Sequence, residues 1–181
     1  MSSVRTTGWR RYVAASAVGA MLAVLGGTAM SAQDKYSLKL PLPFSDIRGY
    51  EGWQVVSVST PEGKIKAILG NPTMIQAYQA GIPGNGKPFP DGSKLVKIIW
   101  NTKKSTEAPF DVMVPDVLDK VEFMEKDAKR FSDSGGWGYA PFQYDAASDA
   151  FTPLANDAKC GAACHTIVTK KDFVFTAYAK R

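Results

Sequence analysis

Between residues 51 and 145, apolar and polar positions alternate in short runs, the pattern of half-buried β-strands. Strands are predicted for EGWQVVSVST (51–60), KIKAILG (64–70), SKLVKIIW (93–100), FDVMV (110–114) and GGWGYAPFQYD (135–145), and KVEFMEKD (120–127) also alternates. GIPGNGKPFPDG (81–92) is dense in glycine and proline and predicts a loop, as does KLPLPFSDIRGY (39–50).

One segment before the C-terminal region has helical spacing instead. In NPTMIQAYQAG (71–81), Met74, Ile75 and Tyr78 share one side of a helix, Pro72 suits its first turn and Gly81 suits its end. The balance of elements predicts an α+β fold that is predominantly an antiparallel β sheet with a few helices.

The first 32 residues differ from the rest. Arg5, Arg10 and Arg11 precede an uncharged apolar run over 13–30, and small residues follow it. This layout is typical of a bacterial secretory signal peptide (1–32), so we expect cleavage after Ala32, a single domain over 33–181 and a periplasmic location. A retained membrane anchor is the alternative, although the run is Gly/Ala-rich and short for a spanning helix.

Charge does not favour a nucleic-acid partner. The whole chain carries +5, but the predicted signal peptide holds three arginines and no acid, which leaves 19 Lys and Arg against 17 Asp and Glu. No basic stripe is present, so we expect no nucleic acid to bind.

The candidate chemistry lies near the C-terminus, in KCGAACHTIVTKKDFVFTAYAKR. Cys160 and Cys164 are the two cysteines, and His165 is the only histidine. In C-x-x-C-H, both thiols attach haem covalently and the histidine binds its iron. Here one extra residue separates the cysteines, but the linker is small and positions i and i+4 share a helix face, so both sulfurs can point the same way. A disulfide between Cys160 and Cys164 is the alternative, and its short loop would add little stability.

The motif therefore predicts one covalent haem c, with His165 on the iron, beneath an antiparallel sheet. Met74, Met113 and Met124 are the methionines outside the signal segment, and core packing is expected for all three. An iron without a methionine ligand has an open face that binds small gases, whereas a Met/His iron carries electrons. Phe89 and Phe142 are named as candidates for an apolar pocket over that face.

These segments, in this order, resemble the cytochrome P-460 family of exported c-type haem proteins. The resemblance is carried by RGYEGWQVVSVS, NPTMIQAYQAG, KPFPDGSKLVKIIW, KDAKRFSDSGGWGYAPFQYD and CGAACHTIVTKKDFVFTAY, nearly the whole mature chain. The extra residue in the haem motif departs from the family pattern. The resemblance implies a mostly β fold, a single C-terminal haem c, Sec export and often a homodimer.

The resemblance also implies two kinds of chemistry. Some members oxidise hydroxylamine or process nitric oxide and have a lysine cross-linked to the haem, and Lys97 in PDGSKLVK is the matching position. Related members, the cytochromes c′-beta, bind nitric oxide or carbon monoxide in an apolar pocket. By strand alternation Lys97 shares a face with Leu95 and Ile99, where a snorkelling lysine is the alternative.

Oxidising members also use a carboxylate as a proton acceptor. In our alignment it falls on Thr169, which cannot act as a base, and this counts against hydroxylamine oxidation. Asp172 is the nearby carboxylate, and we expect it to be a solvated charge near a helix end.

The sequence therefore predicts a periplasmic mono-haem c-type cytochrome with five-coordinate iron. It would bind or redox-process small nitrogen oxides, nitric oxide or hydroxylamine, and use a periplasmic electron-transfer partner. The alternatives are a gas-binding protein of the c′-beta kind without turnover, a simple electron-transfer cytochrome, and a haem-free module closed by a disulfide.

Overall fold

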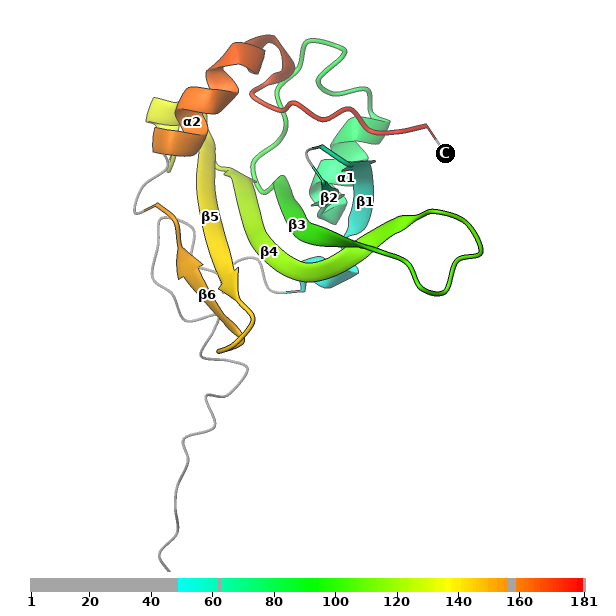
Figure 1. Cartoon of the computed structure of the whole chain (residues 1–181). Helices are drawn as coiled ribbons and strands as arrows, with labels where there is room; N and C mark the ends of the chain where they lie inside the picture. The colour runs from blue at the N-terminus through cyan, green and yellow to red at the C-terminus, as the bar shows by residue number, and fades with distance from the viewer. Residues whose placement is uncertain (1–48, 62, 156–158, 181) are drawn as a thin grey trace, which may run out of the picture.

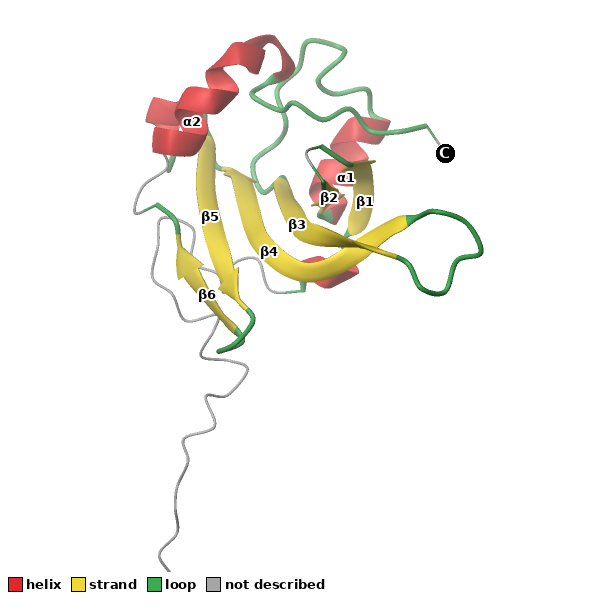
Figure 2. Ribbon diagram, in the orientation of Figure 1, coloured by secondary structure: helices red, strands yellow, loops and turns green. Residues whose placement is uncertain are grey.

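The computed structural model describes residues 49–61, 63–155 and 159–180, which contain a six-stranded antiparallel sheet (Figure 1, Figure 2). Each strand pairs with the next one in the sequence, so the sheet is a simple meander from β1 to β6. The strands are β1 (Gln54–Ser59), β2 (Lys64–Gly70), β3 (Lys94–Lys104), β4 (Met113–Lys126), β5 (Trp137–Asp145) and β6 (Ala150–Pro153). The predicted α+β fold with a predominantly antiparallel sheet is confirmed.

The predicted helix is also present, as α1 (Pro72–Gln79). The Asn71 side chain accepts a hydrogen bond from the backbone N–H of Met74 at 3.0 Å, which caps the helix, and Pro72 occupies its first turn. Gly81 follows with a left-handed φ of 86°, a conformation that suits glycine. The side chains that α1 buries are those of Met74, Ile75, Ala77 and Tyr78.

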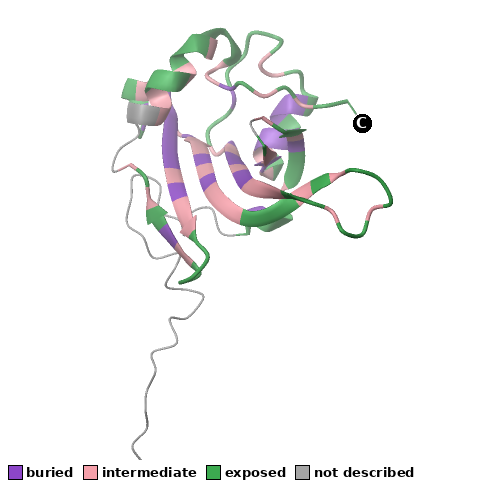
Figure 3. Cartoon of the chain, in the orientation of Figure 1, coloured by how far each residue is buried: buried purple, intermediate pink, exposed green. Residues whose placement is uncertain are grey.

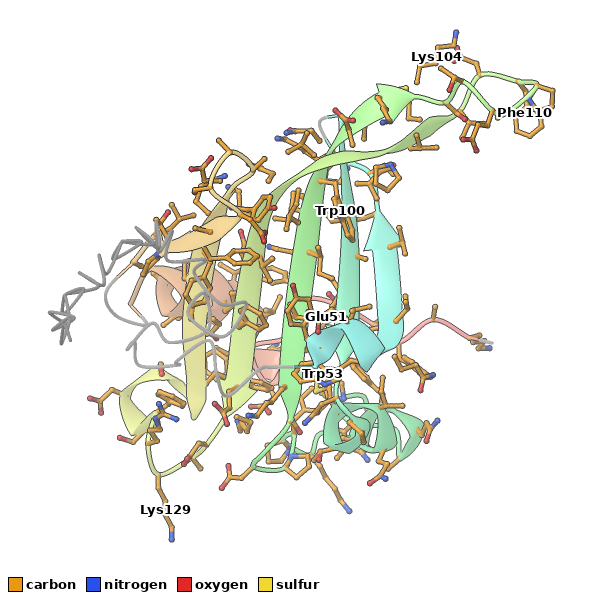
Figure 4. The ribbon with its side chains drawn as sticks, turned by 90° about the horizontal axis from the view of Figure 1, so that it is seen from below. Glu51, Trp53, Trp100, Lys104, Phe110 and Lys129 are labelled. Atoms are coloured by element: carbon orange, nitrogen blue, oxygen red, sulfur yellow. The ribbon has the colours of Figure 1, made fainter. Side chains whose placement is uncertain are left out.

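Strands β3 and β4 are longer than predicted, and their far ends form a hairpin arm, residues 101–117, that projects from the sheet (Figure 1). Figure 4 shows Lys104 and Phe110 near its tip, away from the labelled Trp53 and Trp100. Residues 113–114 of the strand predicted over 110–114 and residues 120–126 of the alternating segment over 120–127 belong to β4 as one element. The arm has little buried surface, and the far end of β3, residues 101–104, therefore lacks the alternation that marks a half-buried strand. Strand β6 was missed because it has only four residues.

The sheet buries apolar side chains on both faces. Figure 3 shows the buried and half-buried residues along β3, β4 and β5. One face packs Val96, Ile98, Val121, Phe123 and Phe142 together with Tyr50 of the 3-10 turn η3 (Tyr50–Gly52). The other face packs Leu95, Trp137 and Tyr139 against α1 and Val174. Burial of a large apolar side chain stabilises the fold by about 1.5–3 kcal/mol. Each face is therefore a core of its own.

The second face is covered by the C-terminal region. Helix α2 (Lys159–His165) lies against β5 and continues into the 3-10 turn η5 (Thr166–Lys171). Residues 172–180 then run back across the sheet, with Val174 buried. The Tyr78 hydroxyl donates to the Thr176 carbonyl at 2.8 Å, and the Tyr78 and Tyr178 rings stack at 5.6 Å. This tail is one wall of the site described below.

The predicted signal peptide (1–32) and most of the loop predicted over 39–50 lie outside the described residues. Within the described part of the chain, none of the helices has the length and apolar character needed to cross a membrane.

Candidate functional site

A cavity of about 490 Å³ lies between the second face of the sheet and the C-terminal region. This volume is within the range of small-molecule and cofactor sites. The sheet lines it with side chains from four strands, which include Ile68, Leu95, Lys97, Glu122, Met124 and Tyr139. The C-terminal region lines it with Gly161, Cys164, His165, Val174, Phe175 and Thr176.

Helix α2 brings the residues of the C-terminal motif to this cavity. Cys160 and Cys164 are four residues apart in one continuous helix, so they share a helix face. Cys164 is an exposed free thiol at the cavity, whereas the side chain of Cys160 is outside the described part. Gly161 and His165 form the neighbouring stripe of the helix, which faces β5.

Gly161 allows α2 to lie directly on Tyr139. A Cβ added at Gly161 would lie 2.5 Å from both Cβ and Cγ of Tyr139, closer than real atoms approach. The Tyr139 ring in turn lies beside His165, with ring centroids 4.8 Å apart. Residue 161 therefore sets how near the motif comes to the sheet.

His165 is held by a hydrogen bond between its Nδ1 and the carbonyl oxygen of Phe173, at 2.6 Å. A carbonyl only accepts, so Nδ1 carries the proton and Nε2 keeps its lone pair. Burial lowers the pKa of His165, and the nearby Lys97 lowers it further, while the hydrogen bond to Phe173 and the Glu122 charge oppose the shift. The ring is therefore a neutral imidazole with one nitrogen available, the form that binds a metal.

Lys97 and Glu122 lie opposite each other on β3 and β4, and their side chains form an ion pair at the cavity wall. Both side chains are about one-third exposed. The prediction that Lys97 shares a strand face with Leu95 is correct, because both residues line the same cavity. The site thus combines one neutral imidazole with a paired cation and anion on the sheet.

This set of residues fits a haem. Among the described residues, no three His, Cys, Asp or Glu side chains gather as a metal site. A single imidazole beside a largely apolar cavity suits an iron whose other ligands come from a macrocycle. The buried Tyr139 hydroxyl has no hydrogen-bond partner within the described part of the chain, as expected where a bound group is to supply one.

A comparison with protein families agrees with this chemistry. The family model described as Cytochrome P460 matches residues 47–176, a range that includes Lys97, Glu122 and the whole C-terminal motif. The chain belongs to the cytochrome P460 family. It is therefore a haem c protein, and the resemblance inferred from the sequence is confirmed. No curated protein matches the chain significantly.

The position that the sequence alignment matched to the carboxylate of oxidising members does not reach the cavity. Thr169 is exposed on η5 and is not among the residues that line the cavity, whereas Glu122 is. Residue 169 therefore does not decide whether the cavity holds a proton acceptor. The alternation in KVEFMEKD already placed Glu122 on the face opposite Val121 and Phe123. That Glu122 lies beside Lys97 follows only from the pairing of β3 with β4, which the sequence does not reveal.

The expectation for Asp172 was wrong. Its side chain is only 12% exposed, and it pairs with Lys126 at 2.8 Å. Its second carboxylate oxygen accepts from the backbone N–H of Phe89 at 2.7 Å. Asp172 is thus a buried structural partner, not a solvated charge.

The three methionines have different environments. Met74 is fully buried in the core, as predicted. Met113 is 53% exposed on the arm, so the prediction that it packs in the core is wrong. Met124 is half-buried and lines the cavity, so it is the methionine of interest as an iron ligand.

Neither phenylalanine named for the pocket lines it. Phe89 packs edge-on against Tyr78 and Trp137, and Phe142 lies in the core of the opposite face against Phe123. The aromatic side chains at the cavity are those of Tyr139 and Phe175, and Phe175 stands edge-on to His165 at 4.8 Å. The sequence missed Phe175 because its position depends on the path of the tail.

Proposed function

We propose that this cytochrome P460 is a periplasmic mono-haem protein that binds and oxidises small nitrogen oxides, hydroxylamine or nitric oxide. Cys160 and Cys164 would each add a thiol S–H across a haem vinyl group, and His165 Nε2 would bind the iron. The hydrogen bond from His165 Nδ1 to Phe173 is the observation that carries the proposal, because it leaves Nε2 free and oriented.

A bound haem c supplies a redox-active iron with one face open to a small ligand. The residues of the cavity support chemistry at such a face. Oxidation of hydroxylamine removes electrons and protons together, and Glu122 places a carboxylate at the cavity wall to accept a proton. Lys97 holds that carboxylate in position through their ion pair. The electrons require a periplasmic electron-transfer partner.

Haem attachment is tested with protein matured in a host competent for cytochrome c assembly. Intact mass should equal the cleaved polypeptide plus one haem, and the double change Cys160→Ser, Cys164→Ser should leave no covalent haem. Ala163→Ser, at the exposed neighbouring position, is the matched control and should load normally. A disulfide between the two cysteines and no haem would refute the proposal.

Turnover is tested with Glu122→Gln. If Glu122 accepts the proton, hydroxylamine oxidation should fall by about 10²–10⁴-fold while nitric oxide binding to the ferrous protein stays close to wild type. Glu125→Gln, on the same strand but absent from the cavity, is the control. Wild-type protein that binds nitric oxide but does not oxidise hydroxylamine would favour a gas-binding function of the c′-beta kind.

The location and assembly belong to the same proposal. N-terminal sequencing of periplasmic protein should begin near Gln33, whereas retention of Arg5 would indicate a membrane anchor. The homodimer that the family resemblance implies is checked by light scattering of the matured protein.

A further inference from the structure

Two consecutive residues beside the haem motif have left-handed backbone conformations. Asp172 has φ 49° and Phe173 has φ 63°, and neither is glycine. Such conformations are uncommon outside glycine and persist only where surrounding contacts enforce them. Here they turn the chain after η5 so that the Phe173 carbonyl faces His165 Nδ1.

The contacts that enforce this turn converge on the Asp172 carboxylate. One oxygen accepts from Lys126 Nζ at 2.8 Å, and the other accepts from the Phe89 backbone N–H at 2.7 Å. Both partners of the ion pair are almost completely buried. Asp172 therefore joins three segments that are distant in sequence: the end of β4, the loop before β3 and the tail.

Lys126 is equally well fixed. Its Nζ also donates to the Gly135 carbonyl at 3.0 Å and lies 5.1 Å from the centre of the Trp137 ring. A buried ion pair is seldom a better stabiliser than apolar packing, because both charges lose their hydration. A pair held by this many contacts instead fixes a geometry.

Phe173 is also held from its side-chain end. A Cβ added at Gly135 would lie 2.2 Å from the Phe173 ring, so the ring occupies space that only glycine leaves open. Its backbone N–H donates to the Val168 carbonyl at 3.1 Å. The position of the Phe173 carbonyl is thus determined on both sides.

We infer that the Lys126–Asp172 ion pair is a positioning device for His165, the residue that would bind the iron. The pair holds the Phe173 carbonyl at the place where this carbonyl fixes the tautomer and the orientation of the His165 ring. The inference rests on the proposed function in so far as His165 binds iron. A hydrogen bond donated by the Nδ1–H group increases the basicity of Nε2 and so strengthens its bond to a metal. Loss of the pair is therefore expected to change the iron–histidine bond without any change in a residue that touches the haem.

The test uses Asp172→Asn and Asp172→Gly. Asparagine keeps an oxygen for the Phe89 N–H and tolerates the left-handed conformation, but removes the charge. Glycine removes both contacts without backbone strain. The control is Glu125→Gln, which breaks another largely buried pair on β4, Lys94–Glu125 at 3.2 Å, away from the cavity and the tail.

Resonance Raman spectra of the ferrous haem protein give the first measurement. The iron–histidine stretch should move to lower frequency and the midpoint potential should rise, more in Asp172→Gly than in Asp172→Asn. Glu125→Gln should lower the unfolding temperature and leave both spectroscopic values unchanged. An unchanged stretch and potential in the Asp172 variants that load haem would show that the pair serves stability alone.

A second measurement separates this inference from the proposed function. His165 is the only histidine, so its two ring nitrogens are unambiguous in a ¹⁵N NMR spectrum. In folded protein without haem, the wild type should show a protonated Nδ1, and Asp172→Gly should shift both nitrogens toward a mixture of tautomers. Identical ring spectra would overturn the inference even if the wild type proved to bind no haem. A wild type without haem but with the expected ring spectra would refute only the proposed function.

Discussion

Lys97 on β3 and Glu122 on β4 lie side by side on adjacent strands and form an ion pair at the wall of the cavity that His165 also lines. A lysine amine must lose its proton before it can form a bond to a haem ring, and the adjacent carboxylate can accept that proton. The pair therefore provides the two groups that a cross-link requires. It also holds the lysine in one place until the haem is present.

We predict that peptide mapping will find the fragment with Lys97 joined to the haem peptide 160–165. Replacement of an N–H and a ring C–H by an N–C bond removes a pair of electrons, so maturation should be carried out with an oxidant such as peroxide. Lys97→Ala should give the spectrum of an ordinary high-spin c-type haem. Lys94→Ala is the control, because Lys94 pairs with Glu125 away from the cavity. Separate peptides and an ordinary wild-type spectrum would show that no cross-link forms.

Met124 gives a prediction about the open face. It is the methionine that lines the cavity, whereas Met74 is buried in the core and Met113 is exposed on the arm. We expect carbon monoxide to bind the ferrous protein without displacing a protein ligand, and Met124→Leu to leave the haem spectrum nearly unchanged. Met113→Leu is the control. A near-infrared methionine–iron band that disappears in Met124→Leu would instead favour an electron-transfer cytochrome.

Local signals in the sequence predicted the elements that depend on neighbouring residues. Asn71, Pro72 and Gly81 bound the first helix because capping and glycine conformation act within a few residues. The alternation of β3 placed Lys97 on the face of Leu95 for the same reason.

The features that the sequence did not predict depend on contacts between distant segments. Glu122 reaches Lys97 through strand register, and Asp172 is buried because Lys126, on β4, lies beside it. Phe175 lines the cavity only because the tail crosses the sheet. The spacing of residues along the chain does not reveal such long-range pairings, so a solvated Asp172 was a reasonable but wrong expectation.

Gly161 gives a prediction about the packing of the haem motif. Alanine normally stabilises a helix by about 1 kcal/mol relative to glycine, so a helix effect alone would raise stability. The contact with Tyr139 predicts the opposite, because the added Cβ has no room. We expect Gly161→Ala to destabilise the protein by about 1–3 kcal/mol in urea unfolding and to lower the yield of haem-loaded protein.

Ala163→Ser, at an exposed position of the same helix, is the control for Gly161→Ala. It should neither destabilise the protein nor lower the yield of haem-loaded protein. If Gly161→Ala were as stable as the wild type or more so, α2 would not lie on Tyr139 as described.

Asp119 gives a prediction about acid stability. Its carboxylate accepts from Gln143 Nε2 at 3.0 Å and from Lys64 Nζ at 3.2 Å. The hydrogen bond from Gln143 and the interactions with Lys64 lower the pKa of Asp119. Because the folded pKa lies below the unfolded value of about 3.9, this group stabilises the fold above that pH. Its contribution is lost as the pH falls through the folded pKa.

We therefore expect Asp119→Asn to be less stable than the wild type at pH 7 and to approach it in acid. In urea unfolding at pH 7, 5, 4 and 3, the unfolding free energy should fall less with decreasing pH in the variant than in the wild type. The reason is that the variant lacks the group that takes up a proton on unfolding. Asp111→Asn is the control, since Asp111 is highly exposed at the arm and its pair with Lys104 is a surface contact of little energetic weight. A constant difference between Asp119→Asn and the wild type across this range would mean that Asp119 contributes through its hydrogen bonds alone and that its ionisation is not linked to folding.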